Sequence, residues 1–198
     1  MVSDTLVLGF DTSAAHCAAA LLSGDKVLAS RSEDMGRGQA ERLMPLLQEM
    51  LAEGGATWGD LARIGVGIGP GNFTGIRISV SAARGLALAL DIPVIGISTF
   101  DVIDHLHGPT GLATVPAPRD QAYSRAPGGS PRLLPLAEAE ASGLAPALPP
   151  EPALLAQTIA RLAAVSPTDG PAPAPLYIRP ADAAPARDLP PVILADDA

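Results

Sequence analysis

A glycine-rich turn between two apolar segments constrains the fold of this chain more than any other feature. Residues 69–77 read Gly-Pro-Gly-Asn-Phe-Thr-Gly-Ile-Arg, and they separate a short apolar run from a long segment rich in Ala and Leu. This pattern predicts a buried strand, a tight turn and the start of a helix. Gly69 and Gly71 allow a positive φ or the close approach of another backbone. Asn72 or Thr74 can cap the helix.

The turn can bind an anion or serve as a closely packed turn without a ligand. A helix N-terminus next to glycines offers N–H donors and the positive end of the helix dipole. Two common nucleotide motifs do not fit. A P-loop requires Gly-Lys-Ser/Thr after its spacer, whereas Gly75 is followed by Ile76 and Arg77, and the GxGxxG pattern fails in every register. Both interpretations of the turn stay open at this point.

Composition excludes several classes of protein. The 198 residues include 47% hydrophobic and 17% charged residues, which is typical of a globular protein. A formal net charge of −8 argues against direct binding of nucleic acid, because phosphate binding depends on clustered Lys and Arg. The single cysteine, Cys17, allows no intrachain disulfide and is expected in the core. Residues 1–4 lack the basic region of a secretory signal, and charges interrupt the apolar stretch 76–97, so we expect a cytoplasmic protein without a membrane span.

The order of predicted elements differs between the two halves of the chain. In the first half, strands are predicted at 6–10, 16–22, 26–33, 64–68 and 94–97, and helices at 39–53, 73–90 and 99–106. After residue 108 the chain holds 18 of its 21 prolines, which interrupt helices and central strands. Only short strands at 112–115, 121–125, 132–136 and 176–179 and one helix at 153–165 are predicted there.

Four segments resemble the bacterial TsaB family, also called YeaZ. The run GPGNFTGIRISVSAARGLALALDIPVIGIST (69–99) is similar to the long signature of that family. The segments LVLGFDTS (6–13), QAERLMPLL (39–47) and PLYIR (175–179) agree as well. The resemblance is dense from residue 5 to about residue 100 and patchy afterwards.

The resemblance implies an α/β fold of the ribonuclease H-like class, in the actin-like and sugar-kinase ATPase superfamily, with two tandem lobes. Residues 1–107 are expected to form an N-terminal lobe with partner-binding helices. Residues 108–180 are expected to form a shortened, Pro-rich, degenerate C-terminal lobe, and residues 181–198 a loose tail.

The resemblance also implies a function. TsaB is a non-catalytic dimerisation subunit of the bacterial complex that makes N6-threonylcarbamoyladenosine in tRNA. In that family the paralogue TsaD carries the metal and transfers the threonylcarbamoyl group, and TsaE is a small ATPase. TsaB pairs with TsaD, or with itself when TsaD is absent. For this chain we therefore expect no intrinsic cofactor, ATP used only by the complex, and contact with tRNA only through the complex.

Two loops are candidates for a vestigial nucleotide site. In active members of this fold, an acidic residue and hydroxyls after the first strand hold a metal and phosphates. Asp-Thr-Ser at 11–13 can begin a Mg²⁺ site or form an ordinary turn that bonds to its own backbone. A second glycine loop for adenosine is missing, because Gly128-Gly129 lies between prolines without a preceding apolar strand. The candidate loop residues are Asp11, Thr12, Ser13, Gly69, Gly71, Thr74 and Gly75.

Catalytic alternatives have weaker support. An ATP-dependent phosphotransferase of the same fold needs the missing adenosine loop. A metal-dependent glycoprotease-like hydrolase needs metal ligands, yet His16, His105 and His107 form no pair one helical turn apart. His16 and Cys17 are adjacent in a predicted strand, so they point to opposite faces. We therefore expect no catalytic residues and no metal site.

The helices carry more apolar surface than one core can cover. Between Phe73 and Leu90 the only charges are Arg77 and Arg84, and apolarity on all sides implies burial from two directions. One stripe is expected to face the core: Phe73, Ile76, Val80, Ala83, Ala87 and Leu90. The other stripe can be covered by the chain's own second lobe or by a partner. With the 39–53 helix it gives the predicted partner interface: Glu41, Arg42, Met44, Pro45, Gln48, Ile78, Ser81, Ala82, Gly85 and Ala89.

Overall fold

The structure, a computed structural model, describes residues 5–178 and is built around a five-stranded mixed sheet. The strands lie in the order β3-β2-β1-β4-β5: β1 (Leu6–Asp11), β2 (His16–Ser23), β3 (Lys26–Asp34), β4 (Leu61–Gly67) and β5 (Val94–Ile97). The first three strands are antiparallel, and β4 and β5 run parallel to β1. The fold is therefore ribonuclease H-like, as predicted.

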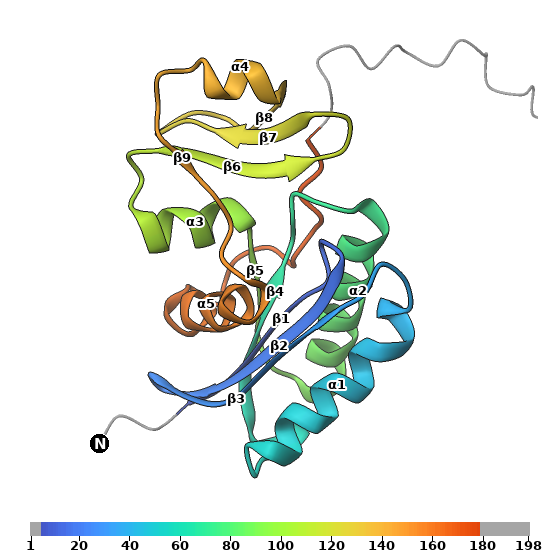
Figure 1. Ribbon diagram of the computed structural model, residues 1–198. Helices are drawn as coiled ribbons and strands as arrows, with labels where there is room; N and C mark the ends of the chain where they lie inside the picture. Colours follow the sequence, from blue (N-terminus) through green and yellow to red (C-terminus); the bar gives the residue numbers. More distant parts are fainter. Residues whose placement is uncertain (1–4, 179–198) are drawn as a thin grey trace, which may run out of the picture.

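Helices cover both faces of this sheet (Figure 1). On one face lie α1 (Gln39–Glu53) and α2 (Phe73–Leu90), packed against strand residues such as Leu8 and Phe10. On the other face lies α5 (Pro152–Val165), whose alanines pack against Val7 and its neighbours in β2. The bounds predicted for α1 and α2 agree with the structure. Pro45 lies inside α1 without ending it.

A second, smaller sheet lies beyond one end of the first (Figure 1). Its order is β8-β7-β6-β9: β6 (Leu112–Ala117), β7 (Gln121–Arg125), β8 (Arg132–Pro135) and β9 (Pro146–Ala147). Phe100 and Ile103 of α3 (Thr99–His107) pack on β6, and Ala139 of α4 (Leu136–Glu140) packs on the opposite face. Only short elements form here, which agrees with the high proline content.

Several elements differ from the predictions. The prediction of a strand at 176–179 is wrong over the described residues, because residues 176–178 form no strand. Here the Leu176 N–H donates a backbone hydrogen bond to Ile68 O at 2.8 Å. The short helices α4 and η1 (Trp58–Asp60) and the strand β9 were not predicted. The lobe boundaries stay a prediction, and α5, placed in the second lobe, packs on the first sheet. The predicted tail 181–198 lies outside the described residues.

Among the described residues, α2 is the one helix that is long and apolar enough to cross a membrane by length and composition alone. Helices that cover a protein core pass the same test. Ile76, Val80 and Ala83 of α2 are buried in the core cluster that includes β4. Packing on the sheet therefore accounts for the apolar character of the inner side of α2.

We predict that Gly9→Ala destabilises the protein by about 1–3 kcal/mol, because it overpacks a rigid contact. A Cβ on Gly9 would lie 2.5 Å from Ala156 O and 2.7 Å from Ala160 N, which are backbone atoms of α5. Gly36→Ala is the matched control, since a Cβ there meets nothing within 4 Å. Urea unfolding measures both variants. Equal stability of the two variants would contradict the close packing of α5 on β1.

Candidate functional site

The two predicted loops lie in direct contact. The Asn72 N–H donates to Ser13 O at 2.6 Å, and Thr12 Oγ1 donates to Gly75 O at 2.7 Å. A Cβ on Gly75 would collide with the Thr12 carbonyl, and one on Gly71 with that of Ser13. The glycines are thus required for the approach of the two backbones.

The remaining loop residues occupy different positions. Gly69 has φ of 91°, a conformation that favours glycine. Thr74 is exposed on the first turn of α2 and does not cap it. Asn72 is the cap, because its Oδ1 accepts from Gly75 N–H at 2.9 Å.

Asp11 is buried at the end of β1 and binds its own turn. Its Oδ1 accepts from Ser13 N–H at 2.8 Å, from Ser13 Oγ at 2.8 Å and from His16 Nε2 at 2.7 Å. Its Oδ2 lies against Gly67 and has no hydrogen-bond partner among the described residues. A divalent cation requires several oxygen ligands, and one free carboxylate oxygen does not provide them. The described part of the chain holds no group of three or more His, Cys, Asp or Glu that fits a metal.

Cys17, next to His16 in β2, is fully buried. Burial raises the pKa of its thiol to about 11, and Glu33 adds to the shift. The thiol therefore stays protonated at neutral pH. Cys17 is a core residue, as predicted, and is unsuited to act as a nucleophile.

A cavity of about 540 Å³ opens beside the two loops, between the two sheets. Ser13, His16 and Asn72 border it on one side, and Thr99 and Tyr123 come from α3 and β7. Sequence reasoning did not identify Thr99 or Tyr123. Their segments are far apart in the chain, and no spacing pattern connects them.

The predicted partner residues face outward. None of the ten is buried: Arg42, Ile78 and Ala82 are half-buried, and Glu41, Met44, Pro45, Gln48, Ser81, Gly85 and Ala89 are exposed. Leu88 belongs to neither predicted stripe, yet its side chain is 87% exposed on the same helix. Sequence reasoning missed this exposure, because a leucine is normally expected to be buried.

Phe73 does not belong to the core stripe, although Ile76, Val80 and Ala83 do. It is 51% exposed, its ring stacks on Tyr177 with 4.8 Å between centroids, and Arg77 Cζ lies 3.7 Å from its centroid. The prediction for Phe73 is wrong because β4 ends at Gly67, so the first turn of α2 extends past the sheet.

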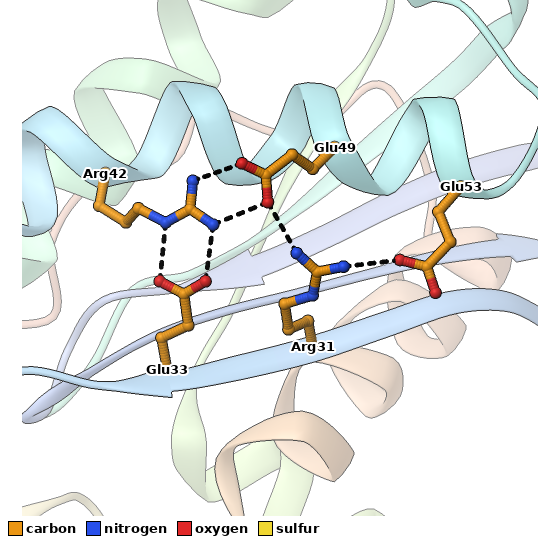
Figure 2. A network of polar contacts seen from close by, with 5 residues as sticks. All are labelled: Arg31, Glu33, Arg42, Glu49 and Glu53. Carbon is orange, nitrogen blue, oxygen red and sulfur yellow. Dashed lines mark hydrogen bonds and ion pairs between the residues drawn. The ribbon is translucent and has the colours of Figure 1, made fainter.

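An ion-pair network joins α1 to the edge strand β3 (Figure 2). Arg42 binds Glu33 through two bonds of 2.6 and 2.7 Å and binds Glu49 through two bonds of 2.7 Å. Arg31 binds Glu49 at 2.7 Å and Glu53 at 2.9 Å. Hydrogen bonds from Arg42 hold the pKa values of Glu33 and Glu49 below their usual range. Arg42, predicted to contact a partner, is therefore already engaged within the chain.

We predict that Arg42→Met lowers the urea midpoint at pH 7 and that this loss disappears toward pH 3. The depressed pKa values of Glu33 and Glu49 mean that the network stabilises the fold above the usual Glu pKa of about 4.3. The stabilisation is lost as the pH falls through the lower folded values. Arg37→Met, an exposed control in the loop before α1, is expected to change little. A loss that is independent of pH would show that the packing of Arg42, and not its charge, stabilises the fold.

Comparisons with known proteins identify the family. A family model described as TsaD, tRNA N6-adenosine threonylcarbamoyltransferase, matches residues 29–112. The tRNA threonylcarbamoyladenosine biosynthesis protein TsaB of Buchnera aphidicola is 38% identical over 98 residues, which cover 50% of this chain and 46% of that protein. An uncharacterised protein of Mycobacterium tuberculosis is 34% identical over 203 residues, which cover 93% of this chain and 96% of that protein.

The structural comparison agrees. YeaZ from Pseudomonas aeruginosa superposes with a TM-score of 0.64 and 25% identity, covering 81% of this chain and 91% of that one. The chain spans about half the length of the curated TsaB relative from Buchnera. The segments shared with TsaB proteins and the common fold lead to one conclusion: the chain belongs to the TsaB (YeaZ) family.

Proposed function

We propose that this chain is a non-catalytic subunit of bacterial tRNA N6-threonylcarbamoyladenosine synthesis in the cytoplasm. It pairs with a catalytic chain of the TsaD type, or with a second copy of itself when that chain is absent. Family membership supports this proposal, because relatives carry the name of that pathway. TsaE and ATP act in the same complex, and tRNA is reached only through it, in agreement with the net charge of −8.

The state of the two loops supports the non-catalytic part of the proposal. Three N–H donors of these loops are used within the protein. Ser13 N–H binds Asp11, Asn72 N–H binds Ser13 O, and Gly75 N–H binds the Asn72 side chain. The loops at 11–13 and 69–75 therefore have the character of a vestigial nucleotide site whose geometry is kept for packing.

The observation that carries the pairing is the outer face of α2. Leu88 is 87% exposed, and the small residues Ser81, Gly85 and Ala89 lie exposed beside it. Met44 on α1 adds a side chain that is 40% exposed. The two helices lie side by side on one face of the sheet, and the second sheet lies beyond the end at which α2 begins (Figure 1). Small residues allow close helix approach, so the pair fits a helical bundle with another chain.

Charge substitutions on α2 test the pairing. We expect Ala82→Arg and Ala89→Arg to leave a folded monomer whose affinity for TsaD is at least about 100-fold lower, since an unpaired charge would be buried at the interface. Ala83→Arg, on the fully buried side, should unfold the protein. Ala137→Arg, on the distant exposed helix α4, is the matched control. Light scattering and pull-down with TsaD measure the result. Normal assembly of folded Ala82→Arg and Ala89→Arg would eliminate this face as the interface.

Assays on the purified chain test the absence of catalysis. We expect no stoichiometric zinc or iron by metal analysis, and ATP hydrolysis far below 1 s⁻¹, a rate at the low end of typical enzymes. Asp11→Ala is expected to have little effect on the activity of the reconstituted complex, because the chemistry belongs to TsaD. Turnover near 1 s⁻¹ by the isolated chain that disappears in Asp11→Ala would instead establish a phosphotransferase-type enzyme.

A further inference from the structure

The cavity beside the two loops has the size and position of a ligand site. Its volume of about 540 Å³ lies within the range of small-molecule pockets, about 300–1,000 Å³. It lies beyond the carboxyl ends of the parallel strands β1 and β4, where open α/β sheets bind ligands. The vestigial loops form only one side of it. Its remaining walls come from α3, the second sheet and the start of α5.

One side of the cavity is polar. Thr99 is only 5% exposed, and its hydroxyl makes no hydrogen bond within the described part of the chain. His16 is 6% exposed and borders the cavity with its Nε2 held by Asp11. Donation from Nε2 to the carboxylate leaves Nδ1 as the ring nitrogen available to a ligand. The site therefore offers a hydroxyl group and an imidazole nitrogen that can form hydrogen bonds with a polar group of a ligand.

The other side of the cavity is apolar. Val115, Tyr123 and Leu155 contribute side chains to it. Six prolines complete the wall: Pro70, Pro116, Pro118, Pro149, Pro150 and Pro152. Proline rings lose little conformational entropy on binding, so this wall suits a flat apolar or aromatic group.

Charge restricts the ligand further. No Lys or Arg lies among the described residues that line the cavity, and the Asp11 carboxylate lies directly behind His16. Three N–H donors of the loops, those of Ser13, Asn72 and Gly75, are used within the protein. A negatively charged ligand would therefore find no Lys or Arg side chain among the described lining residues, and only the N-terminal ends of α2 and α3 would offer it a positive potential.

We propose that this cavity binds a small uncharged amphipathic molecule, with an aromatic or apolar body against the prolines and a hydroxyl or amide group at Thr99 and His16. This site goes beyond the proposed function, and its test does not depend on pairing with TsaD.

Titration of the full chain with 3-phenylpropionamide, followed by two-dimensional amide NMR, tests the site. We expect saturable shifts at Asn72, Thr99 and Tyr123 with Kd of about 5 mM or below, a value typical of a fragment. The matched anion, 3-phenylpropionate, should bind at least about tenfold more weakly. The absence of shifts up to about 20 mM, or binding of the anion at least as tight as that of the amide, would overturn the proposal.

Isosteric variants test the polar contact. Thr99→Val should weaken the binding of 3-phenylpropionamide about fivefold, which corresponds to the loss of one hydrogen bond. Thr99→Ser should restore the affinity. Thr110→Val is the matched control, because Thr110 lines a separate hollow at the other end of α3. Unchanged affinity in a folded Thr99→Val variant would overturn the assignment of the polar end.

Discussion

Two hydrogen bonds join the turn after β1 to the turn before α2, and they position the start of α2 against the first sheet. Asn72 N–H binds Ser13 O, and Thr12 Oγ1 binds Gly75 O. Each bond contributes only about 0.5–1.5 kcal/mol net, but leaving a buried partner unpaired costs about 1–3 kcal/mol. α2 begins at this contact, and Ile76, Val80 and Ala83 of the helix then pack on the sheet. The same contact forms one wall of the cavity.

This contact also bears on the proposal that the chain is non-catalytic. In an active nucleotide site, donors in such loops stay free for the ligand, and the ligand completes the structure. Here the two loops form hydrogen bonds with each other. One carboxylate oxygen of Asp11 accepts hydrogen bonds from Ser13 and His16. These contacts form within the chain and require no nucleotide. Both proposals for this chain therefore rest on the outer face of α2 and on the cavity, and not on chemistry in the loops.

The first half of the fold was predictable because its signals are local and long. A capped helix start and helical periodicity gave the bounds of α1 and α2. The glycine turn allowed either a positive φ or the close approach of another backbone, and the structure shows both, at Gly69 and at Gly71. The second half was harder, since elements as short as β9 and α4 carry too few residues for a periodic pattern. The cavity and the pairing of Arg42 with Glu33 depend on contacts between separate segments. Phe73 was misassigned because periodicity does not reveal where the sheet ends.

The ion-pair network adds a reason for association through helices. The strand β3 lies at the edge of the five-stranded sheet, and an exposed edge strand can pair with another chain. Charged side chains on this strand, Arg31 and Glu33, are held by partners on α1, so the edge is bordered by a fixed set of charges (Figure 2). Pairing of a second strand there would have to disturb that network or desolvate it, and both are unfavourable. The outer face of α2 around Leu88 carries one charged side chain, Arg84, one helical turn before it. Contact there would bury the exposed Leu88 without breaking the ion-pair network of β3, which favours this face over the sheet edge.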